Sequence, residues 1–232
     1  LPECPYCFNP INNSGTSSDA LRGGDTRDIL RLAMKRRPMW RIRPGGAPET
    51  PTIFTDRLEL TILDRSHAGE VVDYYARNRR FLAPWVPKRD EEFFTKRYQQ
   101  QMLSRDFTEA LGKTKLPFWL RRRDDGKIIG AAIFSNIIYG SFRSCFLGYN
   151  LDEEETGKGY MTEALQATIG YVFHTVRLHR VEANVMPRNE ASLRVLDGLG
   201  FRREGYSPRY LEIAGRWEDH IRMAILSDEY TA

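Results

Sequence analysis

A glycine-containing loop between an apolar strand and a long helix constrains this chain more than any other stretch. The loop reads Thr156-Gly157-Lys158-Gly159-Tyr160-Met161-Thr162 and follows the strand sequence Leu147 to Leu151. From Met161 to Val176, apolar side chains recur at spacings of three and four residues, which predicts a helix with one buried face. The stretch therefore predicts a strand, a loop and a helix in direct succession.

The loop has the features of a phosphate-binding site. Two glycines let backbone N–H groups point outward at the positive end of the helix dipole, where phosphate binds. Gly157-Lys158-Gly159 lacks the Lys-Ser/Thr ending of a nucleoside-triphosphate loop, and Thr162 stands where a dinucleotide fingerprint needs a third glycine. These two common ligand classes are excluded. A turn whose glycines serve only the geometry of the chain remains the structural alternative.

Two further stretches downstream of the loop make the pattern specific. A strand from Arg180 to Met186 leads into Asn189-Glu190-Ala191-Ser192, and an apolar helix then ends in Leu199-Gly200-Phe201. With the Gly-Lys-Gly-Tyr-Met-Thr-Glu-Ala run of the loop, these motifs resemble the GNAT (Gcn5-related N-acetyltransferase) superfamily. The closest resemblance is to its RimJ/RimL-type branch, which acetylates the N-termini of ribosomal proteins, and it covers roughly residues 52–228.

The resemblance implies a fold and a cofactor. The fold would be α/β, with a mixed, mostly antiparallel seven-stranded sheet flanked by about four helices. The cofactor would be acetyl-CoA (coenzyme A), held by the backbone of the loop and, in the manner of an added strand, by the strand before it. Thr156 and Met161 differ from the residues usual in the family, which matters little where the backbone binds. The residues expected to bind the cofactor are Tyr149, Asn150, Leu151, Thr156, Gly157, Lys158, Gly159, Tyr160, Met161, Thr162, Asn184, Asn189 and Ser192.

The general base is expected on the strand that follows the loop helix. Because side chains alternate along a strand, Arg180, Glu182 and Asn184 share one face of it. By resemblance this face meets the acetyl group, so Glu182 is the expected base for the attacking amine, directly or through a water molecule. The alternative is a structural ion pair of Glu182 with Arg180 or Arg202.

The departing thiolate needs a proton donor as well. The tyrosine that many GNAT enzymes use would fall at Leu196, so by resemblance the Ser192 hydroxyl is the expected donor, and Asn189 is expected to fix the pantetheine arm. Alternatively, Asn189 only caps the last helix by accepting the Ser192 N–H. Cys145 lies in a predicted strand with no histidine nearby in sequence, so direct attack without a covalent enzyme intermediate is expected.

The binding site for the amine that accepts the acetyl group is expected beside aromatic residues. By resemblance Trp85 lines it, and Tyr210 and Trp217, with Tyr206, are expected to form its walls, although aromatic residues on sheets more often belong to the core. The expected acceptor is the α-amine of a protein N-terminus, such as that of a ribosomal protein. The alternatives are a small amine, such as an antibiotic or polyamine, and a non-catalytic acyl-CoA sensor.

Composition and charge argue against a nucleic-acid-binding protein, a membrane protein and a secreted disulfide-rich protein. The net charge of +4 suits an anionic cofactor, and no dense basic stripe indicates direct, sequence-specific nucleic-acid binding. No apolar run approaches the roughly 20 residues of a membrane span. Three cysteines do not form a secreted disulfide framework. A soluble, cytoplasmic monomer or homodimer is expected, although a chain beginning with Leu1 leaves a removed targeting segment open.

The first 50 residues differ in composition from the rest and are rich in proline, glycine and polar residues. We expect residues 1–50 to form a loosely organised extension with one short helix, Thr26–Arg37, and residues 51–232 to form the acetyltransferase domain. Cys4 and Cys7 have the spacing of half a zinc site, but no second pair follows nearby, so no metal site is expected. The alternatives for these two thiols are metal binding between two molecules and a redox pair.

Within the domain, the sequence predicts seven strands, at residues 57–62, 118–123, 127–138, 142–151, 180–185, 202–213 and 216–226. Besides the helix after the glycine loop, it predicts helices at residues 66–77, capped by Ser66, at 91–111, ended by Gly112, and at 189–199.

Overall fold

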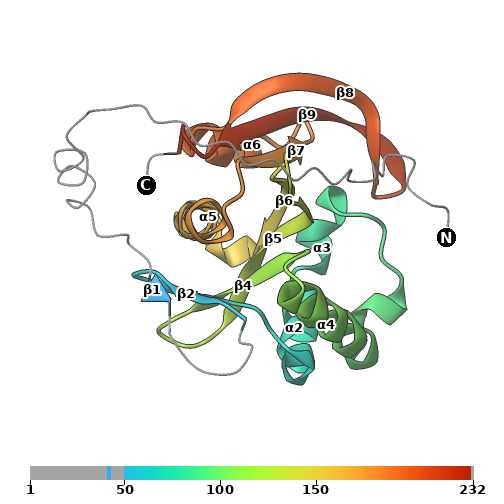
Figure 1. Cartoon of the computed structure of the whole chain (residues 1–232). Helices are drawn as coiled ribbons and strands as arrows, with labels where there is room; N and C mark the ends of the chain where they lie inside the picture. The colour runs from blue at the N-terminus through green and yellow to red at the C-terminus, as the bar shows by residue number, and fades with distance from the viewer. Residues whose placement is uncertain (1–40, 43–49, 231–232) are drawn as a thin grey trace, which may run out of the picture. The chain divides into compact units, whose positions relative to one another are not determined.

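The computed structural model describes residues 41–42 and 50–230, with side chains from residue 50 onward (Figure 1). The strands are β1 (Arg41–Ile42), β2 (Thr52–Phe54), β3 (Leu58–Thr61), β4 (Leu116–Arg122), β5 (Ile128–Ile138), β6 (Ser144–Leu151), β7 (Arg180–Val185), β8 (Arg202–Ile213) and β9 (Arg216–Leu226). The helices are α2 (Ala68–Arg77), α3 (Arg79–Leu82), α4 (Lys96–Leu111), α5 (Tyr160–Tyr171) and α6 (Glu190–Gly198). A π-helical stretch, Val172–Val176, extends α5, and short 3-10 turns lie at Arg65–His67, Ala83–Trp85, Glu91–Phe94 and Glu153–Glu155.

The described strands form one mixed sheet in the order β1-β2-β3-β4-β5-β6-β7-β9-β8. Its neighbours pair antiparallel except β6 and β7, which are parallel. The predicted α/β fold with a mixed, mostly antiparallel sheet is confirmed, but the described part of the chain holds nine strands instead of seven. The additional strands, β1 and β2, are two and three residues long, too short for an alternating pattern to reveal.

Most of residues 1–50 lie outside the described part of the chain, so the predicted domain boundary at residue 50 is not tested. β1 lies before residue 50 and pairs with β2, while the expected helix Thr26–Arg37 and the Cys4 and Cys7 pair lie outside the described residues. The boundary at residue 50 therefore remains a prediction.

Helices cover both faces of the sheet, and Figure 1 shows α5 on the opposite side of the sheet from α2 and α4. Strand β4 explains this arrangement, because successive side chains of a strand point to opposite faces. Phe118 is buried in a core that includes Leu165 of α5, whereas the next residue, Trp119, is buried in a core that includes Tyr74 of α2. Leu196 places α6 in the same core as α5.

Two predicted helix starts are wrong in detail. Asp64, and not Ser66, caps the turn before α2: its carboxylate accepts a hydrogen bond of 2.8 Å from the Ser66 N–H. The helix predicted from Glu91 to Leu111 is divided at Thr95, which has an extended backbone and caps α4 with its side chain. Short polar side chains compete with helical hydrogen bonds in this way, and apolar spacing does not reveal it. Gly112 ends α4 as predicted.

No helix within residues 50–230 is long and apolar enough to cross a membrane.

Candidate active site

The parallel strands β6 and β7 separate after a short paired segment. They pair only from Ser144 and Arg180 to Phe146 and Glu182, after which β6 continues to Leu151 and β7 to Val185 without pairing to each other. Unpaired backbone N–H and C=O groups on these edges are available to an extended ligand, in the manner of an added strand. The end of this strand, Gly148-Tyr149-Asn150-Leu151, which we expect to hold the cofactor in the manner of an added strand, is therefore unpaired toward β7.

A buried polar atom lies at this opening without a partner. The side chain of Asn184 stands on β7 just beyond the paired segment, and its Oδ1 is buried with no hydrogen-bond partner among the described residues. Leaving such an acceptor unsatisfied costs about 1–3 kcal/mol, so native structures usually satisfy it. An N–H group of a ligand entering between β6 and β7 is a fitting partner.

The glycine loop lies between the end of β6 and the start of α5. Gly157 and Gly159 have positive φ angles of 76° and 80°, a region in which side chains are strained, and Gly159 is the N-cap of α5. A Cβ atom at Gly157 would meet nothing within 4 Å, so the space beside this residue is open, whereas a Cβ atom at Gly159 would lie 3.5 Å from Arg57 Nη2. Lys158 Nζ turns back to Glu155 Oε2 at 2.9 Å, which leaves backbone N–H groups to face an anion.

A set of contacts that the sequence did not predict holds this loop in place. Glu163, in the first turn of α5, accepts hydrogen bonds from Thr55 Oγ1 at 2.6 Å and from Arg57 Nε at 2.6 Å. Arg57 also donates to the carbonyl oxygen of Lys158 at 2.9 Å, and its guanidinium lies 4.3 Å from the centroid of the Tyr160 ring. Arg57 and Glu163 therefore tie the residues before β3 to the glycine loop.

We expect this contact to make the stability of the protein depend on pH in the acid range. Burial opposes ionisation of Glu163, but hydrogen bonds from Thr55 and Arg57 outweigh it, so the pKa of Glu163 is lowered from its ordinary value of 4.5. The stabilisation is therefore complete above pH 4.5 and is lost as the pH falls through the lowered pKa.

Glu163→Gln should lower the melting temperature at pH 7, and the difference from the wild type should shrink in thermal melts below about pH 4. Glu190→Gln is the matched control, because Glu190 also lies in the first turn of a helix but its side chain is 79% exposed. A difference for Glu163→Gln that is the same at pH 3 and pH 7 would contradict the assignment.

Asn189 and Ser192 begin α6 as predicted. Asn189 Oδ1 accepts a hydrogen bond of 3.2 Å from the Ser192 N–H, which is the cap that the sequence offered as an alternative. The Ser192 hydroxyl is not free, because its Oγ lies 2.6 Å from the Tyr149 hydroxyl oxygen. Leu196, at the position of the usual tyrosine, is fully buried in the core.

Glu182 lies on the polar face of β7, where alternation of buried and partly exposed residues agrees with the sequence pattern. Its Oε1 accepts a hydrogen bond of 2.9 Å from Arg180 Nε, and Arg180 also donates to Glu204 of β8. The ion pair that the sequence offered as an alternative is thus present with Arg180, whereas Arg202 pairs with Glu229.

Several of the expected cofactor residues have their side chains committed elsewhere. Asn150 Oδ1 accepts a hydrogen bond of 2.6 Å from the Tyr74 hydroxyl, and Thr156 Oγ1 donates to the carbonyl oxygen of Glu153 at 2.8 Å. Met161 is buried in the core, while Thr162 and Leu151 are partly buried. If these residues contact a ligand directly, they do so largely through their backbone.

The expected acceptor residues are spread over two segments that contact each other. Trp85 is partly exposed, and the Arg188 guanidinium lies 5.0 Å from its ring centroid. Arg188 also pairs with Glu218 of β9 at 3.0 Å, which links the Trp85 segment to the β8–β9 hairpin. Tyr210 is 37% and Trp217 62% exposed, so the core alternative is wrong for both, as it is for the exposed Tyr206.

Cys145 does not qualify as a nucleophile. It is buried, and burial, with a smaller contribution from Glu182, raises the pKa of its thiol to about 12. A thiol in this state is not ionised near neutral pH, and the thiolate is the reactive form.

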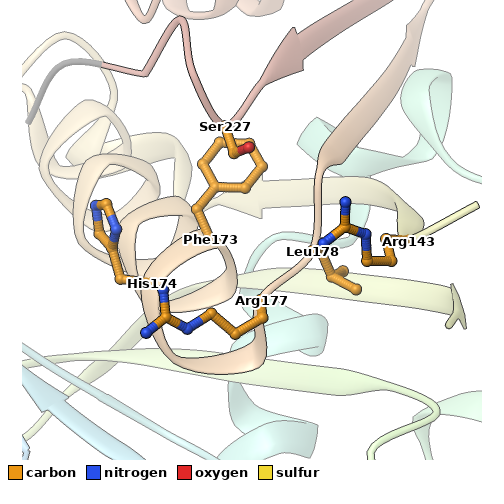
Figure 2. Close-up of a pocket in the computed structure, with 6 residues that line it drawn as sticks. All are labelled: Arg143, Phe173, His174, Arg177, Leu178 and Ser227. Atoms are coloured by element: carbon orange, nitrogen blue, oxygen red, sulfur yellow. The ribbon is translucent and has the colours of Figure 1, made fainter. Parts of the chain in front are cut away.

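A pocket of about 270 Å³ lies away from these residues, at the other end of α5 (Figure 2). It is formed by the end of the π-helical stretch, the segment before β6 and the residue after β9, with Arg143, Arg177 and Ser227 among its lining residues. It is not part of the candidate active site. Among residues 50–230, no three His, Cys, Asp or Glu side chains gather in a way that suits a metal ion.

The comparisons with known proteins define the class. Residues 57–202 match the model of the acetyltransferase (GNAT) domain, and the chain belongs to this family. It is an N-acetyltransferase, and its cofactor is the acetyl-CoA that the family uses. The open glycine loop and the unpartnered Asn184 oxygen fit a ligand with a pyrophosphate and an amide-bearing arm.

Within this family, the chain is similar to several acetyltransferases of ribosomal proteins. The chain is 41% identical over 179 residues to the [ribosomal protein uS5]-alanine N-acetyltransferase of Escherichia coli (strain K12), covering 77% of this chain and 92% of that protein. The structure of ribosomal-protein-S5-alanine acetyltransferase from Vibrio fischeri is similar with a TM-score of 0.74 and 36% identity, covering 78% of this chain and 99% of that one. Mycobacterium smegmatis RimJ in complex with CoA-disulfide has a TM-score of 0.71 and 30% identity, covering 82% and 86%.

Proposed function

We propose that this chain transfers the acetyl group of acetyl-CoA to the N-terminal α-amine of a ribosomal protein by direct attack in a ternary complex. The observation that carries the proposal is the opening between β6 and β7, with the unpartnered Asn184 Oδ1 beside it and the glycine loop after β6. A pantetheine arm has amide groups for strand edges, and a pyrophosphate suits a helix N-terminus. The buried Cys145 thiol supports direct attack.

Each group of residues has a role in this proposal. The backbone of Tyr149 to Leu151 and the side-chain Oδ1 of Asn184 bind the pantetheine arm. The backbone N–H groups of Gly157 to Gly159 bind the pyrophosphate. Bound acetyl-CoA supplies the thioester whose carbonyl carbon the amine attacks. Glu182 accepts a proton from the amine, directly or through water, and the Ser192 hydroxyl donates to the departing sulfur.

The choice of acceptor rests on two supports. The relative from Escherichia coli is named for the alanine of a ribosomal protein, and a ribosomal acceptor implies a cytoplasmic enzyme. An α-amine also titrates near pH 7.7–8.0 and a lysine side chain near 10.4, so much more of the α-amine is deprotonated at neutral pH. A larger fraction of the α-amine is therefore already neutral before Glu182, which pairs with Arg180, has to accept a proton from it.

A peptide assay tests this acceptor. A peptide that begins with alanine and has a free α-amine should be acetylated with a kcat/KM at least about 10² times that of the same peptide with a blocked α-amine and internal lysines. The product is located by mass spectrometry. Faster acetylation of the blocked peptide or of a polyamine would contradict the N-terminal assignment and favour a small-amine acetyltransferase. Binding of acetyl-CoA without release of thiol with any amine would favour the non-catalytic sensor.

A further inference from the structure

Tyr149, near the C-terminal end of β6, contacts the residue proposed as proton donor. Its hydroxyl oxygen lies 2.6 Å from Ser192 Oγ and 3.2 Å from the carbonyl oxygen of Ser192. The tyrosine ring is partly buried against the core that includes α5 and α6. The serine hydroxyl is therefore held by a side chain that is itself fixed by packing.

The position of this contact connects it to the opening between the strands. Tyr149 lies three residues beyond Phe146, the last residue of β6 that pairs with β7, and α6 follows β7 in the chain. The pair of hydroxyl groups therefore bridges β6 and α6 where the two strands have separated. On the proposed function, the thioester sulfur lies at this opening.

The direction of the hydrogen bond decides what the contact does. At 2.6 Å one hydroxyl donates to the other, and either is able to be the donor. The tyrosine proton has two acceptors within reach, the Ser192 carbonyl oxygen at 3.2 Å and the nearer Ser192 Oγ at 2.6 Å. If Tyr149 donates to the carbonyl oxygen, Ser192 Oγ donates to Tyr149 and has no proton left for the sulfur. If Tyr149 donates to Ser192 Oγ, the serine proton is free to point into the opening, and negative charge developing on sulfur favours this order because the two O–H dipoles then align toward it.

We propose that Tyr149 is a positioning residue whose O–H donates to Ser192 Oγ and turns the serine proton toward the departing sulfur. The inference rests on the role proposed for Ser192. When the C–S bond breaks, its electron pair passes to sulfur, which takes the Ser192 proton. As Ser192 Oγ gives up this proton it takes one from water, and the hydroxide left behind is neutralised by the proton that Glu182 accepted from the amine. Tyr149 carries its proton when the step begins, because burial raises the pKa of its hydroxyl to about 12.

A double-mutant cycle tests the inference with an alanine-terminated peptide as acceptor. Tyr149→Phe keeps the ring and should lower kcat about tenfold, with KM for the peptide and affinity for coenzyme A unchanged. Ser192→Ala should lower kcat by on the order of 10². The two changes together should cost no more than Ser192→Ala alone, because the tyrosine acts only through the serine. Tyr171→Phe is the control, since Tyr171 is also partly buried against the same core and has no hydroxyl hydrogen bond among the described residues.

Each outcome bears on a different claim. An unchanged kcat for Tyr149→Phe, or an equal loss when Ser192 is already alanine, overturns the positioning role. A weakened affinity for coenzyme A with an intact kcat makes Tyr149 a binding residue and overturns it as well. If Ser192→Ala keeps the wild-type kcat, Ser192 is not the proton donor to sulfur, and the positioning role of Tyr149 is overturned with it. If the wild-type enzyme prefers another amine to the peptide, the proposed acceptor fails by itself, and the same cycle run with that amine still decides the role of Tyr149.

Discussion

Gly159→Glu is expected to abolish binding of acetyl-CoA while the protein remains folded. Gly159 is the left-handed N-cap of α5, where the loop meets the positive end of the helix dipole. A carboxylate there opposes the pyrophosphate, and two like charges about 4 Å apart near a protein surface repel each other by about 4 kcal/mol. The dissociation constant should therefore rise by at least about 10²-fold. A side chain in the left-handed region costs about 1–2 kcal/mol, which most domains tolerate.

Calorimetric titration with coenzyme A, together with a thermal melt, measures both effects. Gly140→Glu is the control for backbone strain, because Gly140 has a φ of 72° but lies in the turn between β5 and β6. A Cβ atom at Gly140 would meet nothing within 4 Å, whereas one at Gly159 would lie 3.5 Å from Arg57 Nη2. The control should lose similar stability and keep its affinity. Unchanged affinity in a folded Gly159→Glu protein would show that the loop does not bind the pyrophosphate.

Glu182→Gln is expected to lower kcat by on the order of 10² to 10⁴ with affinity for acetyl-CoA unchanged, the usual range for general acid–base catalysis. Glutamine has nearly the same shape but accepts no proton from the amine. The loss should shrink at high pH, where more of the amine is already deprotonated. A pH profile of kcat for the wild-type and variant enzymes measures this dependence.

The ion pair of Glu182 with Arg180 requires a control that breaks the same network. Arg180 pairs with Glu204 of β8 as well as with Glu182, so Glu204→Gln removes a carboxylate from the same arginine without touching the polar face of β7. If Glu182 is the base, Glu204→Gln keeps nearly full activity. Equal losses in the two variants, or none in Glu182→Gln, would make Glu182 a structural partner of Arg180.

Periodicity along the chain predicted most elements of the domain. The predicted bounds of β7, β8 and β9 agree with the structure, and α5 starts beside the predicted residue. These elements are long, and their patterns are local, so the sequence carries them. β1 and β2 were missed because they are short, and the break at Thr95 was missed because it depends on a side chain that caps α4.

The candidate site was predicted only in part. The glycine loop, the Asn189 cap and the polar face of β7 follow from residue types and spacing. The partners of the side chains do not follow in the same way. Nothing in the order of residues indicates that Tyr74 holds Asn150, or that Arg180 is shared between Glu182 and Glu204. A residue type states what a side chain is able to bind, and the fold decides which partner it meets.

The sequence by itself predicted the strands and helices, because glycines before an amphipathic helix and alternation along strands are local properties of the chain. It indicated the class of the protein through the resemblance of its motifs to the GNAT superfamily. The tertiary structure alone decided how the site is held together. Arg57 meets Glu163 across 106 residues, and Tyr149 meets Ser192 across 43. Such contacts form only when the sheet brings distant strands and helices together, and their geometry depends on packing that no local pattern encodes.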